Sequence, residues 1–432
     1  MRRIYVNENN FKQAIKNINE RSEKFYREID NVVLNIINDV KEKGDKALLY
    51  YTNAFDKVNL DDLKVKDKEI ENALSIVQEE FIEILKEAKK NIYEYHEKTL
   101  QSSWMMYKNE GIILGQKVSP IERVGIYVPG GKAAYPSTVL MNAIPAQIAG
   151  VESIVLVSPP DKNGSISPYI LAAAWVCGIK EIYKIGGAQA IAALAYGTET
   201  IKPVYKITGP GNIYVARAKS MVYGKVDIDM VAGPSEICVV ADESSDTKFI
   251  AADMLSQAEH DENAASILIT TSEKVAYKVI ENINTQLKYL SRKDIIEKSL
   301  ESNCRIFITD NIKTCINICN EIAPEHLEIM VENPFELLPL VKNAGAIFLG
   351  KFSPEPLGDY FAGPNHTLPT SGTAKFSSPL SVESFMKKSS IIYYDEMNLK
   401  NIKDKIIKFA NNEGLDAHAN SIKVRFDYGE AN

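Results

Sequence analysis

The chain has 432 residues, 45% hydrophobic and 25% charged, a composition typical of globular rather than disordered proteins. Its 50 Lys and Arg residues against 57 Asp and Glu give a net charge of -7 with no concentrated basic block, so nucleic acid is not an expected partner. The longest apolar run, near residues 170–179, is too short to predict a membrane span. Five scattered cysteines with no CxxC pair predict a cytoplasmic protein without a disulfide framework or a thiolate zinc site.

The first hundred residues predict helices. Apolar side chains between Val32 and Val40 recur at helical spacing, and Gly44 follows where a helix commonly ends. A second helical pattern covers residues 67–101, either as one long helix or as two.

From Arg123 onward, short β-rich runs alternate with Ala-rich helical stretches, which is typical of a largely parallel sheet covered on both faces. Two such units predict a cleft between them, where ligands commonly bind. A Pro-, Gly- and Ser-rich stretch at 352–383 predicts loops, and a small C-terminal unit contains a helix near 399–411. The expected strands are 124–128, 153–157, 181–185, 204–207 and 237–240 in the first set, and 266–270, 305–308, 327–331 and 346–349 in the second.

Four of the five histidines lie in the last 173 residues, beside carboxylates, glycines or amides. In residues 256–261 (SQAEHD), Gln257 and His260 share one face of a helix end, so an amide oxygen and an imidazole nitrogen could bind one metal ion. A polar helix end with a capping histidine is the alternative from spacing alone.

The tandem pair Glu325 and His326 follows Pro324 at the entrance of an expected strand. Both side chains can transfer protons, because a neutral imidazole accepts a proton and a carboxylate can activate water. Adjacent strand residues point to opposite faces, so the two serve one site only if the chain turns at Pro324. A solvated Glu-His pair remains the alternative.

Asp359 lies between loop glycines, and Glu413 and His418 lie on either side of a glycine turn near the C-terminus. Alone, that last pattern is typical of a helix end. Together, however, four side chains would provide two nitrogen and two oxygen ligands, a mixture that suits zinc better than manganese or cobalt. These are Gln257, His260, Asp359 and His418.

Three glycine-rich segments could bind anions. Residues 127–132 (YVPGGK) lack the Ser or Thr of a nucleotide triphosphatase loop, and the chain has no GxGxxG fingerprint. Residues 186–190 (GGAQA) and 209–212 (GPGN) each place backbone N–H groups at a helix start, which suits a pyrophosphate. For each of these two segments taken alone, tight-turn packing of the glycines is the favoured explanation. Cys238 is a conceivable nucleophile, but its apolar strand favours a buried, inert thiol.

These motifs appear in one order along the chain. Residues 233–236 (GPSE) follow the three glycine-rich segments and precede residues 256–261. Residues 323–327 (APEHL), 358–360 (GDY), 363–366 (GPNH) and 413–418 (EGLDAH) complete the series. The whole chain resembles the histidinol dehydrogenase family.

The resemblance implies oxidation of L-histidinol to L-histidine through L-histidinal, with two NAD⁺, in histidine biosynthesis. It places one zinc ion per subunit on Gln257, His260, Asp359 and His418. The catalytic pair becomes Glu325 and His326, and Tyr127, Gln189 and Asn212 contact NAD⁺. Substrate contacts fall on Ser235, Gln257, His260, His326, Asp359, Glu413 and His418.

The implied fold is α/β, with two incomplete Rossmann-like domains resembling those of aldehyde dehydrogenases and a small helical tail. Residues 1–29 would be a helical part of the tail, 30–126 the helical part of the first domain, and 127–236 the NAD-binding domain. Residues 237–380 would carry the zinc and catalytic groups, and 381–432 the tail. The family forms an intertwined homodimer in which the tail of one subunit completes the site of the other.

Two other functions stay open. An aldehyde dehydrogenase would use Cys238 as a nucleophile, and a regulatory module would bind zinc and nucleotide without turnover. A related amino alcohol could also replace histidinol as the substrate.

Overall fold

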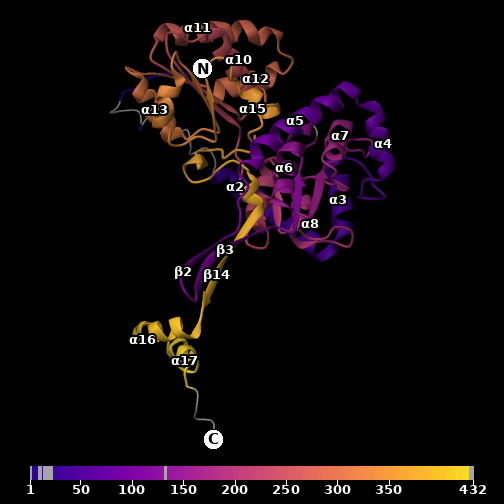
Figure 1. The fold of residues 1–432 in the computed structure, drawn as a ribbon. Coiled ribbons are helices and arrows are strands. Elements are labelled where there is room, and N and C mark those ends of the chain that lie inside the picture. Colours follow the sequence, from indigo (N-terminus) through magenta and orange to yellow (C-terminus); the bar gives the residue numbers. More distant parts are fainter. Residues whose placement is uncertain (1, 8–11, 13–22, 131–133, 428–432) are drawn as a thin grey trace. The chain divides into compact units, whose positions relative to one another are not determined.

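The computed structural model describes residues 2–7, 12, 23–130 and 134–427, so Gly131, Lys132 and Ala133 of the first glycine-rich segment lie outside the described residues. The chain divides into two compact units (Figure 1). The first unit comprises Met1–Thr99 and Ile121–Phe385, and the second comprises Leu100–Pro120 and Met386–Asn432.

The first unit contains two parallel sheets. The five-stranded sheet has the order β6-β5-β4-β7-β8, and the six-stranded sheet has the order β1-β11-β10-β9-β12-β13. The first sheet is formed by β4 (Arg123–Tyr127), β5 (Ser153–Ser158), β6 (Glu181–Lys184), β7 (Lys206–Thr208) and β8 (Asp227–Ile228). The second is formed by β1 (Arg2–Tyr5), β9 (Glu236–Ala241), β10 (Ala265–Thr270), β11 (Arg305–Ile308), β12 (His326–Met330) and β13 (Ala346–Leu349). These sheets confirm the predicted α/β class.

Helices cover both faces of the five-stranded sheet, because successive strand residues enter different cores. Tyr127 packs with α2 (Glu23–Lys43), α8 (Gly187–Tyr196) and α9 (Ile213–Val222), whereas Ile126 packs against the other group of helices. That other group consists of α4 (Asp67–Ile76), α5 (Glu79–Glu97), α6 (Pro136–Ala149) and α7 (Pro168–Val176). The helical pattern of residues 67–101 is thus two helices, and α3 (Asp45–Asp56) follows α2 directly.

The six-stranded sheet is covered in the same way. Val239 packs with α10 (Thr247–Ala258), α11 (Glu273–Gln286) and α12 (Lys293–Ser302), whereas Cys238 and Val240 pack with α13 (Ile312–Ile322). After β12 and the short α14 (Pro334–Leu337), the chain forms β13 and then α15 (Glu355–Tyr360), a helix where loops were expected.

The N-terminus differs from the expectation of a helical tail segment. Arg2–Tyr5 forms β1, which pairs with β11 at the edge of the six-stranded sheet. The rest of the expected segment includes residues 8–11 and 13–22, which lie outside the described residues.

The second unit contains an antiparallel sheet that the sequence pattern did not predict. Its strands are β2 (Trp104–Asn109), β3 (Ile112–Pro120) and β14 (Met386–Tyr394), with β3 in the middle (Figure 1). Two helices follow, α16 (Glu396–Asn412) and α17 (Asp416–Lys423), and α16 confirms the helix predicted near 399–411. No helix of the described residues combines the length and apolar character that a bilayer-spanning segment needs.

A buried ion pair fixes the loop between β7 and α9. The Lys219 ammonium pairs with the Asp229 carboxylate and donates to the Gly209 carbonyl (2.9 Å), while the Gly209 amide donates to Asp229 (2.8 Å). Gly209 has φ +109°, and a Cβ there would lie 2.0 Å from the Tyr127 carbonyl oxygen. The ion pair thus holds a loop that only glycine can form.

We predict that Lys219→Met lowers the free energy of unfolding by roughly 3–5 kcal/mol, because it leaves the Asp229 charge buried without its partner. Urea unfolding measures this loss. Lys298→Met is the control, since it removes the exposed partner of Glu262 and should leave stability unchanged within error. Equal losses in both variants would contradict the assigned role of the buried pair.

Candidate active site

Glu325 and His326 are held by the backbone of one residue on the neighbouring strand. The Glu236 amide donates to Glu325 Oε2 (2.9 Å), and His326 Nδ1 lies 3.0 Å from the Glu236 carbonyl oxygen. The two side chains therefore serve one site, and Glu325 Oε2 lies 3.7 Å from His326 Nδ1. Ala323, with φ +52°, provides the turn that was expected next to Pro324.

The hydrogen bond to Glu236 sets the tautomer of His326. Because a carbonyl only accepts, Nδ1 carries the proton and the lone pair is on Nε2. Burial lowers the pKa of His326 to about 4, so its ring is neutral at pH 7. Burial also raises the pKa of Glu325 well above its usual range. The site thus contains a neutral imidazole ready to accept a proton.

A second cluster contains groups that could hold a metal ion. His260 follows α10, and its ligand nitrogen lies within 4.8 Å of carboxylate oxygens of Glu355 and Asp359, all three of which lie within that distance of one another. Gln257, one turn earlier, is fully buried, and neither its amide oxygen nor its amide nitrogen has a hydrogen-bond partner among the described residues. Such an orphaned amide is costly unless something else binds it.

Glu355 links the two clusters and was missed by sequence reasoning. Its Oε1 lies 3.9 Å from His326 Nε2, and the residue is 1% exposed. Burial raises the pKa of its carboxyl to about 9, with the nearby Asp359 charge as the next cause. The signal in the sequence was the spacing of Glu355 and Asp359, four apart, which places both on one helix face.

His366 supports Asp359. Its Nδ1 lies 3.2 Å from the Asp359 carbonyl oxygen and 3.7 Å from the carboxylate oxygen Oδ1, while its Nε2 lies 3.4 Å from the Thr138 hydroxyl at the start of α6. This histidine therefore ties the second sheet's loop to a helix of the first sheet.

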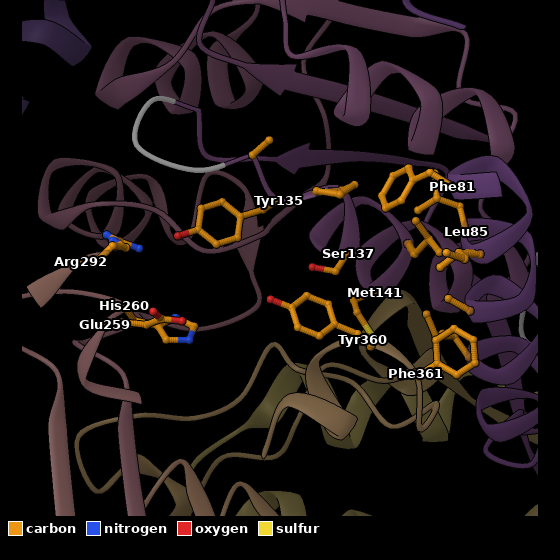
Figure 2. A pocket seen from close by; sticks show the side chains of 16 residues that line it. Phe81, Leu85, Tyr135, Ser137, Met141, Glu259, His260, Arg292, Tyr360 and Phe361 are labelled. Atoms are coloured by element: carbon orange, nitrogen blue, oxygen red, sulfur yellow. The ribbon is translucent and has the colours of Figure 1, made fainter. Parts of the chain in front are cut away.

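A cavity of about 410 Å³ opens beside His260. Figure 2 shows Glu259, His260 and Arg292 at one end and Phe81, Leu85 and Phe361 at the other, with Tyr135 and Tyr360 between them. A small molecule with one polar and one apolar end would fit these walls.

The glycine-rich segments meet at the carboxyl ends of the first sheet. The Gly187 amide donates to the Tyr127 hydroxyl (3.1 Å), and burial raises the pKa of that phenol to about 12. Gln189 is 1% exposed, and its Oε1 has no partner among the described residues. Asn212 begins α9 and accepts from the Tyr214 and Val215 amides at 3.0 and 3.2 Å.

The remaining predicted residues are placed as follows. Ser235 is half-buried and directly precedes Glu236, and its carbonyl accepts from the Ala265 amide (2.9 Å). Glu413, at the end of α16, and His418, in α17, are exposed residues of the second unit. They thus lie in a different unit from Gln257, His260 and Asp359.

Cys238 does not have the properties of a nucleophile. It is fully buried in β9, and the neighbouring Cys319 thiol, followed by burial, raises its pKa well above the usual value. A thiolate is therefore disfavoured at this position. The alternative of an aldehyde dehydrogenase that uses Cys238 loses its nucleophile.

Comparison with known proteins gives one consistent result. The family model described as histidinol dehydrogenase matches residues 19–426. The chain belongs to the histidinol dehydrogenase family. Enzymes of that name from Clostridium acetobutylicum and Caldanaerobacter subterraneus are 58% and 59% identical over 411 residues, covering 95% of each chain. The crystal structure of histidinol dehydrogenase from Elizabethkingia anophelis matches with a TM-score of 0.93 and 41% identity, covering 98% of both chains.

Membership of this family makes the protein an oxidoreductase and confirms the resemblance drawn from the ordered motifs. It also argues against the alternative of a non-catalytic module, because the chain matches nearly the full length of relatives that are named as enzymes.

Proposed function

We propose that this protein oxidises L-histidinol to L-histidine, using zinc and two molecules of NAD⁺. One observation carries the proposal: the backbone of Glu236 forms hydrogen bonds with both Glu325 and His326. These two bonds hold two proton-transfer groups at one site. The assignment of histidinol as the substrate is supported by relatives that match 95% of the chain and are named histidinol dehydrogenase.

The residues present fit a zinc ion. Gln257 has a buried amide without partners, and His260 and Asp359 offer a nitrogen and an oxygen within 4.8 Å of each other. His418 of the second unit would be the fourth ligand. When bound, zinc would orient the substrate's imidazole and amine, and NAD⁺ would accept the hydrides.

The neutral His326 would act as the base in the first oxidation. Its free Nε2 lone pair would take the alcohol proton as hydride leaves the carbon, which gives the aldehyde. Glu325 would then deprotonate the water that attacks the aldehyde. The Glu236 amide donates to Glu325 Oε2 and so stabilises the carboxylate form that accepts this proton. Ser235 and Glu413 would contact the substrate.

We assign NAD⁺ binding to residues 127–236. Gly187 and Asn212 each begin a helix after a strand of the five-stranded sheet, where backbone amides attract phosphate oxygens. Tyr127 and Gln189 lie beside these amides, and the unpartnered Gln189 Oε1 is free to accept a hydrogen bond from the cofactor. Residues 237–380 would then carry the zinc and catalytic groups.

A homodimer is also proposed. The second unit exposes large apolar side chains on its sheet and helices, more than a small unit in water ordinarily carries. A second copy would cover them, as closed twofold dimers commonly do. They are Trp104, Met105, Met106, Tyr107, Ile392, Tyr393, Met397, Phe409, Leu415 and Val424.

The first test is the reaction itself. We expect two NADH formed per histidinol consumed, complete loss of turnover after chelation, and recovery on adding zinc, because the ion orients the substrate. Absorbance of NADH and elemental analysis measure these quantities. Full activity in metal-free protein would refute the zinc assignment, and a closely related amino alcohol is the control substrate.

We predict that His326 and Glu325 act in different steps of the reaction. His326→Ala should slow oxidation of the alcohol by roughly 10²–10⁴-fold, because a general base is lost. Glu325→Gln should chiefly slow oxidation of supplied L-histidinal. Single-turnover rates on alcohol and aldehyde separate the two steps, and equal slowing of both steps in both variants would show that the roles are not separate.

The third test concerns sharing of the site between subunits. If a tail completes the partner's site, the inactive variants His418→Ala and His326→Ala should complement when mixed, to about half the activity per hybrid dimer. The matched control mixes His326→Ala with Glu325→Gln, which leaves a defect in every site and should stay inactive. Verified hybrids without recovery would place His418 in its own subunit's site.

A further inference from the structure

We propose that Asp56 accepts a hydrogen bond from the adenosine ribose of NAD⁺ and thereby selects NAD⁺ over NADP⁺. The inference rests on the proposed function, in which residues 127–236 bind NAD⁺, and it adds a residue that precedes them in the chain. NADP⁺ differs from NAD⁺ by a phosphate on the 2′ oxygen of this ribose. Proteins that bind NAD⁺ commonly direct a carboxylate to the ribose, whereas an arginine accommodates the phosphate.

Helix α3 brings Asp56 to the glycine-rich segments, because it packs against α8 and runs antiparallel to it (Figure 1). At the start of α3, the Asp45 amide donates to Glu199 Oε2 (2.7 Å), shortly after the end of α8. At the end of α3, Asp56 lies near Tyr127, where burial and then the Asp56 charge raise the pKa of the phenol. The Tyr127 hydroxyl accepts from the Gly187 amide at the start of α8. Asp56 therefore lies at the end of the sheet where the dinucleotide is proposed to bind.

The described residues do not explain the position of the Asp56 carboxyl. Its Oδ2 is buried and has no hydrogen-bond partner among them, and burial raises the pKa of the group to about 6. The helix ends directly after it, since Lys57 adopts φ +60°, and a negative charge at the carboxyl end of a helix is unfavourable. Because pH 7 lies above this pKa, the group is still mostly ionised. Such a carboxylate costs stability unless a ligand donates to it.

Two other acids near these strand ends are already engaged. Asp161 follows β5, where dinucleotide-binding folds usually carry the acid that binds the ribose. Its Oδ1, however, accepts from two backbone amides of its own turn, at 2.8 and 3.0 Å. Asp229, which follows β8, pairs with the buried Lys219. Of these three acids, Asp56 is the one with a buried oxygen that lacks a partner.

The chemistry of the ribose decides the preference. An ionised carboxylate only accepts hydrogen bonds, and a ribose hydroxyl can donate one. A 2′-phosphate replaces that donor with negatively charged acceptor oxygens, which Asp56 would repel. Gln189 provides a second buried acceptor, because its Oε1 also has no partner among the described residues. Both oxygens suit a ribose with free hydroxyl groups.

The experiment is calorimetric titration of the full chain with NAD⁺, NADP⁺ and 2′-deoxy-NAD⁺, which lacks the 2′ hydroxyl of the adenosine ribose. Wild-type protein should bind NAD⁺ at least about tenfold more tightly than either analogue, because each analogue leaves the carboxylate without its donor.

Asp56→Asn should weaken NAD⁺ binding and leave NADP⁺ binding no weaker, so that the preference falls at least about tenfold. Asp56→Ala, the second variant, should bind NAD⁺ and 2′-deoxy-NAD⁺ with equal affinity, because the hydroxyl has lost its acceptor. Thermal unfolding without ligand should show neither variant less stable than wild type, since each removes a costly buried charge. A purely structural role would instead lower stability and leave the preference unchanged.

Asp161→Asn is the matched control. It also removes a negative charge near the strand ends, but it keeps the Oδ1 acceptor of its turn. The wild-type preference for NAD⁺ should persist in this variant.

Equal affinity of wild-type protein for NAD⁺ and NADP⁺ would overturn the proposal, as would an unchanged preference in both Asp56 variants. Loss of the preference in Asp161→Asn would also overturn it, because charge near the strand ends, and not contact with Asp56, would then be the cause. Wild-type protein that binds neither dinucleotide would refute the cofactor of the proposed function, and this inference with it.

Discussion

The pairing of β9 with β12 is the constraint on which the chemistry depends. Because the two strands are parallel and Ile237 lies opposite His326, the backbone of Glu236 meets both members of the proposed catalytic pair at the start of β12. The N–H group of this one residue donates to a carboxylate, and its carbonyl accepts from an imidazole. That contact fixes the tautomer of His326, and it leaves Nε2 on the side of Glu355, whose Oε1 lies 3.9 Å away.

The two sheets present their functional groups at opposite ends. The glycine-rich segments follow β4, β6 and β7, at the carboxyl ends of the first sheet, which is the usual place for a nucleotide. Glu325 and His326 instead stand at the amino end of β12, and Glu236 begins β9. Gln257 and His260 reach this end because α10 runs back antiparallel to the strands. In the second sheet the candidate site therefore lies at the amino ends of the strands, whereas open α/β sheets normally carry their sites at the carboxyl ends.

The sequence predicted the buried strands well because both faces of each strand are covered, which gives apolar runs that are easy to recognise. Helical spacing also placed Gln257 and His260 at a helix end, where the structure has the end of α10. The strands β2, β3 and β14 were missed because their burial lacks a clean alternation. Glu355 was missed because two prolines and a glycine in residues 354–358 favour a loop, and only the packing against Glu328 shows the helix and its buried acid.

The buried acids support the cation that we propose for this site. Asp253, Glu325, Glu328 and Glu355 are each less than a tenth exposed, and burial is the first cause of the raised pKa of every one of them. Burying several acidic groups in one domain lowers its free energy of unfolding, because each group loses its contact with water. A cation that binds only the folded chain would restore part of this lost stability by mass action. The same carboxyl groups that would be poor choices for a structural core are thus suited to a core that is completed by a metal ion.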